Sequence, residues 1–212
     1  MNYLAHLLLS DNDEKIMVGN FIADWVKGSH HTQYPLGIQK GILMHRAIDS
    51  FTDQHPLHKH SRSFFAPSYG KFSGIVVDVL FDHFLSVHWL EYCKTNRTSF
   101  IEHSYDIMSR YRTFFPPRPK RLLSSIIHHD WMGAYVSFSG LEKVLQRMSR
   151  RTSLPPMTND AIITLRLNYP EIDNDFKQFF KQLQDYVKEW NENYDIQQNR
   201  NRRILKNTHR FI

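Results

Sequence analysis

The chain has 212 residues, of which 41% are hydrophobic and 14% aromatic, and its formal net charge is +6. This apolar content is enough for one compact domain with a sizeable core, and it excludes disorder over most of the chain. The single cysteine, Cys93, excludes an intrachain disulfide and a cysteine-based metal site. The sequence contains no glycine-rich nucleotide-binding loop and no internal repeat.

The positive charge indicates an acidic partner, such as a nucleic acid, an anionic membrane or an acidic protein. Much of the excess lies in residues 199–210, so we expect a domain over residues 1–195 followed by a basic, solvated tail over residues 196–212. The first fifteen residues lack the basic start of a signal peptide and include Asp11 and Asp13. No apolar run approaches the ~18 residues of a membrane span. We therefore expect a cytoplasmic protein, and the sequence carries no signal for an oligomeric state.

Hydrophobic residues recur at helical rather than alternating spacing along nearly the whole chain, which predicts an all-α, single-domain helical bundle. Polar or proline-containing breaks separate the helices, for example Asp13 as an N-cap and Pro116–Pro117 as a stop. The expected helices cover residues 2–9, 14–26, 36–52, 57–65, 72–92, 99–115, 119–129, 141–151, 159–168 and 171–193, with a kink at Pro170 and a further candidate over residues 130–137.

The helix expected over residues 72–92 carries Asp78, Asp82 and His83 within a run of Ile, Val, Leu and Phe. Asp78 and Asp82 are four residues apart, so they share one face of the helix. A buried carboxylate is costly unless it is paired, so these acids need partners. The choice is between a metal site and a buried ion pair with Arg46 or Arg62.

A second expected helix carries His45 and Asp49 at the same spacing. If the two helices face each other, they offer up to five ligands to a divalent metal, namely His45, Asp49, Asp78, Asp82 and His83. Without a cysteine ligand, manganese, magnesium or iron fits this set better than structural zinc. The alternative for His45 and Asp49 is that they hold each other without binding a metal directly.

Three further polar residues fall on expected inward faces. Asp24 is a candidate site residue, with a cap or an ion pair with Lys27 as its alternative. His6 and Asn20 are expected to support the ligands by hydrogen bonds, and the alternatives for His6 are a hydrogen-bonded core role and direct ligation of the metal. The clustered histidines His30, His31, His55, His58 and His60 are expected at the surface.

Several ordered segments resemble a known family: NYLAHLLLS (2–10), GNFIADWVKG (19–28), GILMHRAIDSFTD (41–53), DVLFDHFL (78–85) and MSRR (148–151), the last following Trp131 and Tyr135. Together they resemble the acyl carrier protein phosphodiesterases, also called holo-acyl-carrier-protein hydrolases. The resemblance covers residues 1 to about 190 and implies a fold like that of the helical HD phosphohydrolases. The adjacent pair here is Asp82-His83, whereas that superfamily has His-Asp, so the ligand positions and the number of metals, one or two, stay open.

The resemblance implies manganese-favoured hydrolysis of the phosphodiester that joins 4′-phosphopantetheine to a serine of acyl carrier protein, as part of fatty acid and lipid metabolism. An acidic carrier protein would explain the basic charge without nucleic acid. The family's motif acids and histidines fall on Asp24, His45, Asp49, Asp78, Asp82 and His83.

The expected roles follow from this chemistry. The metal would lower the pKa of a water, and Asp24 or Asp82 would orient or deprotonate that water. His83 or His45 would protonate the leaving alkoxide. Arg46, Arg150 and Arg151 are candidates for holding the phosphate oxygens, although a basic helix end such as 150–151 is often only solvated.

Two other functions compete with this hypothesis. One is a metal-dependent phosphohydrolase of a small nucleotide or another phosphoester, built on the same kind of helical fold. The other is a non-enzymatic helical module that binds RNA or protein and uses its buried acids structurally.

Overall fold

The computed structural model describes residues 1–208, and over this range the protein is a single all-α domain without β-strands. The expected fold class is therefore confirmed. The α-helices are α1 (Tyr3–Leu8), α2 (Glu14–Ile22), α3 (Leu36–Gln54), α4 (Pro56–Tyr69), α5 (Ser73–Val87), α6 (Trp89–Tyr92), α7 (Arg97–Arg110), α8 (Pro117–His128), α9 (Phe138–Arg151), α10 (Thr158–Leu167) and α11 (Tyr169–Thr208). The 3-10 helices are η1 (Ala23–Trp25), η2 (Gly28–Gln33), η3 (Gly70–Phe72), η4 (Arg112–Phe114) and η5 (Gly133–Val136).

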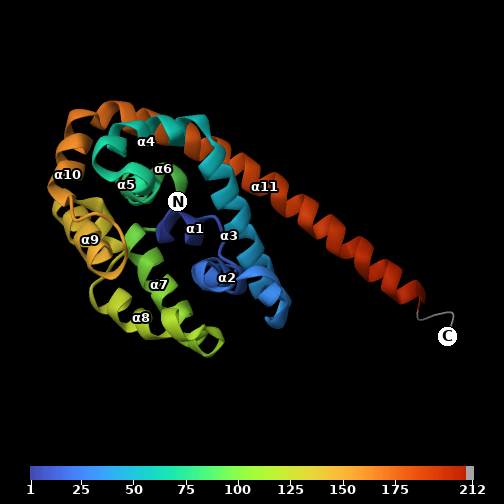
Figure 1. Cartoon of the computed structure of the whole chain (residues 1–212). Coiled ribbons are helices and arrows are strands. Elements are labelled where there is room, and N and C mark those ends of the chain that lie inside the picture. The colour runs from blue at the N-terminus through green and yellow to red at the C-terminus, as the bar shows by residue number, and fades with distance from the viewer. Residues whose placement is uncertain (209–212) are drawn as a thin grey trace.

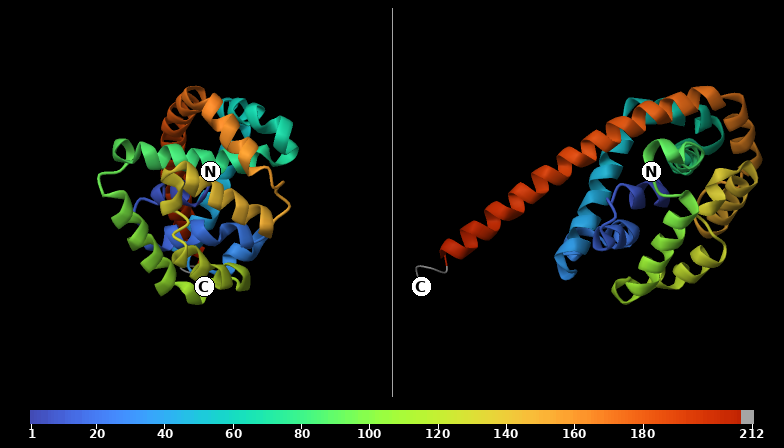
Figure 2. Two further views of the ribbon diagram at one scale, coloured as in Figure 1. Left: turned by 90° about the vertical axis from the view of Figure 1, so that its left-hand side faces the viewer. Right: turned by 180° about the vertical axis from the view of Figure 1, so that it is seen from behind.

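Local chemistry sets several helix starts. The carboxylate of Asp13 accepts from the backbone N–H groups of Lys15 and Ile16 at the start of α2. The helix α11 has Pro170 in its first turn, where a proline is tolerated, and it continues without a break to Thr208. The domain boundary expected at residue 195 falls inside this helix, whose C-terminal part extends away from the other helices (Figures 1 and 2).

The buried helix α5 lies beside α4 (Figure 1) and also packs against η5, α1, α9 and α11. Its aromatic residues contact α11 directly: the ring centroid of Phe81 lies 5.2 Å from that of Phe179 and 5.6 Å from that of Phe176. Because α5 is buried on most sides, its polar residues must find partners on several neighbouring elements. No helix in the described part of the chain is both long enough and apolar enough to cross a membrane.

Helices α2 and α3 pack with their backbones in contact because a glycine stands on each side. A Cβ on Gly19 would collide with the carbonyl oxygen of Ile38, and one on Gly41 with that of Ile16. Asn20 follows Gly19 on α2, and His45 lies one turn after Gly41 on α3. The close approach therefore brings polar residues of the two helices together.

We predict that Gly19→Ala lowers the free energy of unfolding by about 2–3 kcal/mol or more, because two backbones must separate to admit the methyl group. Gly74→Ala is the matched control, since its new Cβ would lie at an ordinary 3.4 Å from the Arg62 guanidinium. That variant should be neutral or stabilised by up to ~1 kcal/mol through its higher helix propensity. Urea denaturation measures both, and equal effects of the two substitutions would contradict the close-packing argument.

Candidate functional site

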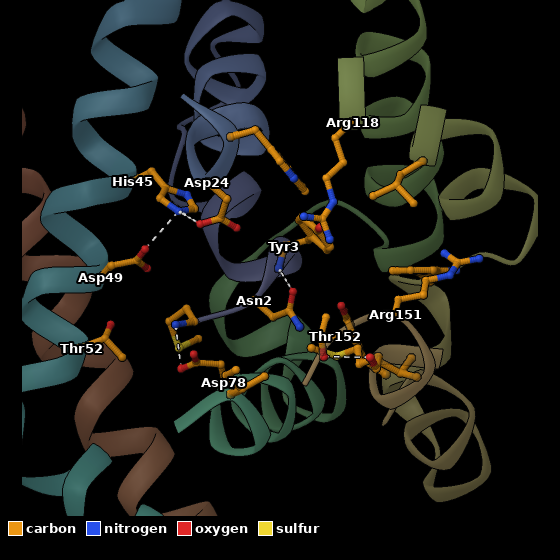
Figure 3. A pocket seen from close by; sticks show the side chains of 18 of the residues that line it. Asn2, Tyr3, Asp24, His45, Asp49, Thr52, Asp78, Arg118, Arg151 and Thr152 are labelled. Carbon is orange, nitrogen blue, oxygen red and sulfur yellow. Dashed lines mark hydrogen bonds and ion pairs between the residues drawn. The ribbon is translucent and has the colours of Figure 1, made fainter. Parts of the chain in front are cut away.

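One cavity of about 420 Å³ lies between the N-terminal segment, α3 and α5 on one side and α8, η5 and α9 on the other (Figure 3). Its acidic side has contributions from η1 and α3 in addition to α5. The lining residues are Met1, Asn2, Tyr3, Asp24, Trp25, His45, Asp49, Thr52, Asp53, Ile75, Asp78, Arg118, Leu122, Trp131, Tyr135, Val144, Met148, Arg151 and Thr152.

His45 is held between two carboxylates at the edge of this cavity (Figure 3). Its Nε2 lies 3.2 Å from Oδ1 of Asp24 and 3.0 Å from Oδ2 of Asp49, which is one turn further along α3. His45 is buried, whereas the side chain of Asp24 is more than half exposed. Asp24 can therefore reach both His45 and a molecule in the cavity.

His6 joins this group from α1. Its ring stacks on that of His45 with the centroids 4.1 Å apart, and its Nε2 lies 3.2 Å from Oδ1 of Asp49. The other ring nitrogen, Nδ1, lies 3.2 Å from Oδ1 of Asn20. Because the Asn20 amide nitrogen donates to Ser10, the Asn20 oxygen is the acceptor and His6 Nδ1 carries the proton. The Nε2 lone pair of His6 is then free and points toward the carboxylate of Asp49.

These contacts and the burial of the residues shift the pKa values of His45, Asp49 and His6. Burial disfavours the charged form of His45, but the carboxylates of Asp24 and Asp49 outweigh it and raise the pKa of His45 to about 9. Burial would likewise raise the pKa of Asp49, but its contacts with His45 and His6 hold it well below its ordinary value. The pKa of His6 is lowered, mainly by burial and then by the charge of His45.

The donor set fits a divalent metal ion. One ligand atom each from His6, His45 and Asp49 can be chosen so that all lie within 4.8 Å of one another. His6 Nε2 is buried and has no hydrogen-bond partner among the described residues. Its ring is oriented by Asn20 from behind, which is the usual arrangement for a histidine ligand. His6 therefore lies among the candidate ligands, which the sequence had offered as an alternative to its expected supporting role.

Asp78 lines the same cavity but has partners of its own. Its Oδ1 accepts from the α-amino group of Met1 at 3.0 Å and from Nε2 of His58 at 3.1 Å. Burial alone would raise the pKa of Asp78, but these two groups lower it to about 2. His58 was expected at the surface, and this expectation is wrong, because the residue is fully buried against Asp78.

The geometry does not place Asp82 and His83 with the His45 group. Asp82 accepts from the backbone N–H groups of Leu4 (2.8 Å) and Ala5 (3.3 Å), so its carboxylate satisfies the free N-terminus of α1. Asp78 and Asp82 thus share a face of α5, as expected, and both meet the N-terminal segment, whereas His83 faces η5 and α11, so the structure does not bring the three residues together around one point.

His83 faces a different part of the fold. Its Nδ1–H donates to the carbonyl of Tyr135 at 2.7 Å, and its Nε2 accepts from the hydroxyl of Tyr169 at 3.0 Å. Burial lowers the pKa of His83, which favours this neutral tautomer. With both ring nitrogens engaged, His83 anchors η5 and α11 to α5 and is not positioned to protonate a leaving group in the cavity.

The three arginines expected to hold the phosphate oxygens lie in different surroundings. Arg46 donates to the carbonyls of Val26 (2.6 Å) and Gly28 (2.9 Å), so it holds the backbone that follows η1. Arg151 lines the cavity and lies over the Trp131 ring at 5.4 Å, whereas Arg150 does not line it.

Arg118 and Tyr3 line the cavity and were not identified from the sequence. In Figure 3, Arg118 reaches in from α8, on the side opposite His45 and Asp24. Among the described residues, no carboxylate forms an ion pair with it. Arg118 lies in the proline-rich stretch 116–119, which is typical of a solvated loop followed by a helix start. Hydrophobic periodicity therefore did not indicate that Arg118 faces a cavity.

Together these features define an all-helical protein with a histidine–carboxylate site at the edge of an internal cavity. A model of the family described as acyl carrier protein phosphodiesterase matches residues 1–183, and the chain belongs to this family.

Relatives that carry the same name are similar over most of their length. The protein of Photorhabdus laumondii is 31% identical over 197 residues, which covers 92% of this chain and 98% of the relative. That of Yersinia pestis is 32% identical over 182 residues, covering 85% of this chain and 94% of the relative. No solved structure matches the chain. The relation to the HD phosphohydrolases stays a prediction.

We predict a distinct pH signature for Asp82. Burial raises the pKa of Asp82 to about 7, above its ordinary value near 4, so the folded state binds this proton more tightly than the unfolded state. The contribution of Asp82 to stability is thus greatest below pH ~4 and declines as the pH rises to ~7. Asp82→Asn removes this dependence.

The wild type should therefore lose on the order of a few kcal/mol of unfolding free energy between pH 4 and 7, and Asp82→Asn should not. The difference, variant minus wild type, should rise by that amount. Denaturant titrations at a series of pH values measure it. A constant difference between the two proteins across this range would show that burial does not control the protonation of Asp82.

Proposed function

We propose that this protein is a metal-dependent phosphodiesterase that hydrolyses the bond between 4′-phosphopantetheine and the serine of holo-acyl carrier protein. The observation that carries the proposal is the group of His6, His45 and Asp49, with Asp24 beside it, at the edge of a cavity in a chain of this family. The products would be the apo-carrier with a free serine hydroxyl and 4′-phosphopantetheine.

The residues that would hold the metal are His6, His45 and Asp49, which leaves the carboxylate of Asp24 free beside them. Two imidazoles in the set favour manganese or iron over magnesium, which prefers oxygen ligands alone. When bound, such an ion supplies Lewis-acid chemistry: it polarises phosphoryl oxygens and lowers the pKa of water.

The chain's own residues would perform two further tasks. Asp24 has an exposed carboxylate beside His45, so it is the group best placed to accept a proton from the attacking water. Arg118, across the cavity, can donate to a non-bridging oxygen of the phosphodiester and balance its charge. The proposal thus gives Arg118 the role that the sequence had suggested for Arg46, because Arg46 is engaged with backbone carbonyls.

We predict that Asp49→Asn abolishes tight Mn²⁺ binding and lowers turnover of holo-acyl carrier protein by at least about 100-fold, because it removes a charged ligand. Asp53→Asn is the matched control, since Asp53 lines the same cavity from α3, one turn further on, without contacting His6 or His45. It should retain both properties within about threefold.

Isothermal titration with Mn²⁺ measures binding, and mass spectrometry of the carrier protein measures loss of phosphopantetheine. Hydrolysis of nucleotides with an unchanged carrier mass would reject the carrier substrate and favour a small-molecule phosphohydrolase. Full turnover after chelation of all metal would reject metal dependence.

We further predict that Arg118→Gln lowers kcat/KM for the carrier substrate about tenfold to 100-fold, the cost of losing one charge-assisted hydrogen bond to phosphate. Arg121→Gln is the control: Arg121 is three residues further along α8, is exposed and does not line the cavity. Steady-state kinetics at low and high salt separate the two positions. Equal losses for both variants would indicate general surface charge rather than a contact of Arg118 with the phosphate.

A further inference from the structure

The phenol of Tyr3 enters the cavity from the start of α1, on the side that carries the histidine and the carboxylates. The residue is partly buried, and its hydroxyl forms no hydrogen bond with the part of the chain that the structure describes. Unlike the hydroxyl of Tyr135, which is fully enclosed, that of Tyr3 keeps access to the cavity. The Tyr3 hydroxyl is therefore a polar group that can meet a bound molecule.

Two opposite charges act on this hydroxyl. In Figure 3, Arg118 extends from α8 toward Tyr3, and Asp24 lies beside His45 on the other side of the cavity. Burial and then the carboxylate of Asp24 raise the pKa of Tyr3, and the guanidinium of Arg118 offsets only part of this. The phenol therefore keeps its proton at physiological pH and can donate a hydrogen bond.

A buried aromatic contact fixes Tyr3 relative to the helix that carries Arg118. The ring centroid of Phe21, on α2, lies 5.3 Å from that of Tyr3 and 5.4 Å from that of Phe115. Phe115 directly precedes the two prolines at the start of α8 and is three residues before Arg118. The side chain of Asn2 accepts from the backbone N–H of Tyr3 at 2.8 Å, which caps α1. The two donors are thus held by the same packed region, although they come from opposite sides of the cavity.

We propose that the Tyr3 hydroxyl forms a two-donor clamp with Arg118, in which each residue donates to a different non-bridging oxygen of the phosphodiester. The proposal rests on the proposed function, in which Asp24 accepts a proton from the attacking water and Arg118 holds one phosphate oxygen. The phosphorus then lies between these two residues, in the region where the Tyr3 hydroxyl meets the cavity. The non-bridging oxygens only accept hydrogen bonds and share one negative charge, which matches one neutral and one cationic donor.

The test uses Tyr3→Phe, which removes only the hydroxyl oxygen, and two ligands that differ by a phosphate group. In titration calorimetry with Mn²⁺ present, the dissociation constant for 4′-phosphopantetheine should rise about tenfold to 100-fold, as for the loss of one hydrogen bond to a charged group. The constant for pantetheine, which has no phosphate, should stay within about twofold. The kcat/KM for holo-acyl carrier protein should fall by about the same factor as the affinity for 4′-phosphopantetheine.

Tyr69→Phe is the matched control. The Tyr69 hydroxyl is also unpartnered among the described residues, but Tyr69 lies on α4 outside the cavity, so this variant should keep every constant of the wild type. Both variants should keep the wild-type unfolding temperature, because neither loses an internal hydrogen bond. Tyr3→Phe should also keep the affinity for Mn²⁺, which shows that Tyr3 does not act by moving His6 on the same helix.

The outcomes separate the clamp from the proposed function. An unchanged affinity of Tyr3→Phe for 4′-phosphopantetheine, or an equal loss for pantetheine or for Mn²⁺, would overturn the clamp. If the wild type leaves holo-acyl carrier protein intact, the proposed function fails. Binding of inorganic phosphate that still depends on the Tyr3 hydroxyl would then support the clamp by itself, whereas a wild type that binds no phosphate would overturn it.

Discussion

The arrangement of this protein depends on one constraint: each carboxylate placed inside the helical bundle must receive hydrogen bonds from specific donors. Asp49 accepts from His45, whose ring stacks on that of His6. Asp78 is shared between His58 and the α-amino group of Met1, and Asp82 receives two backbone N–H groups of α1. Because charges are costly to bury unpaired, each pairing fixes one element relative to another, and together they assemble the edge of the cavity.

The helix α5 connects the two sides of the cavity. Asp82 on this helix holds the start of α1, which presents His6, whereas His83 holds η5, which presents Tyr135. Adjacent residues on a helix point about 100° apart, so one short segment can position both the candidate metal ligands and the opposite wall. Neither Asp82 nor His83 lines the cavity, but the separation of its two sides depends on both.

The sequence predicted the helical fold and the part of the site that obeys helical spacing. His45 and Asp49 are four residues apart on one helix, so their proximity follows from local geometry. The partners of Asp82 and His83 are a backbone N–H and a backbone carbonyl about 50 to 80 residues away, and no side-chain pattern encodes them. His58 and Arg118 were missed for the same reason: the fold alone decides that one meets Asp78 and that the other faces the cavity.

The charge around the cavity bears on how an anionic substrate could enter it. Residues 117–151, from the start of α8 to the end of α9, contain seven Lys and Arg residues but only two acids, so this side attracts a phosphodiester. The opposite side presents Asp24, Asp49, Asp53 and Asp78; His45 and the α-amino group of Met1 balance part of their charge, and the remainder would repel it. A divalent cation held by His6, His45 and Asp49 would change the sign of the local field at the point where the phosphodiester must approach Asp24. Under the proposed function, the charge of the substrate and the donor geometry therefore both support a bound metal ion.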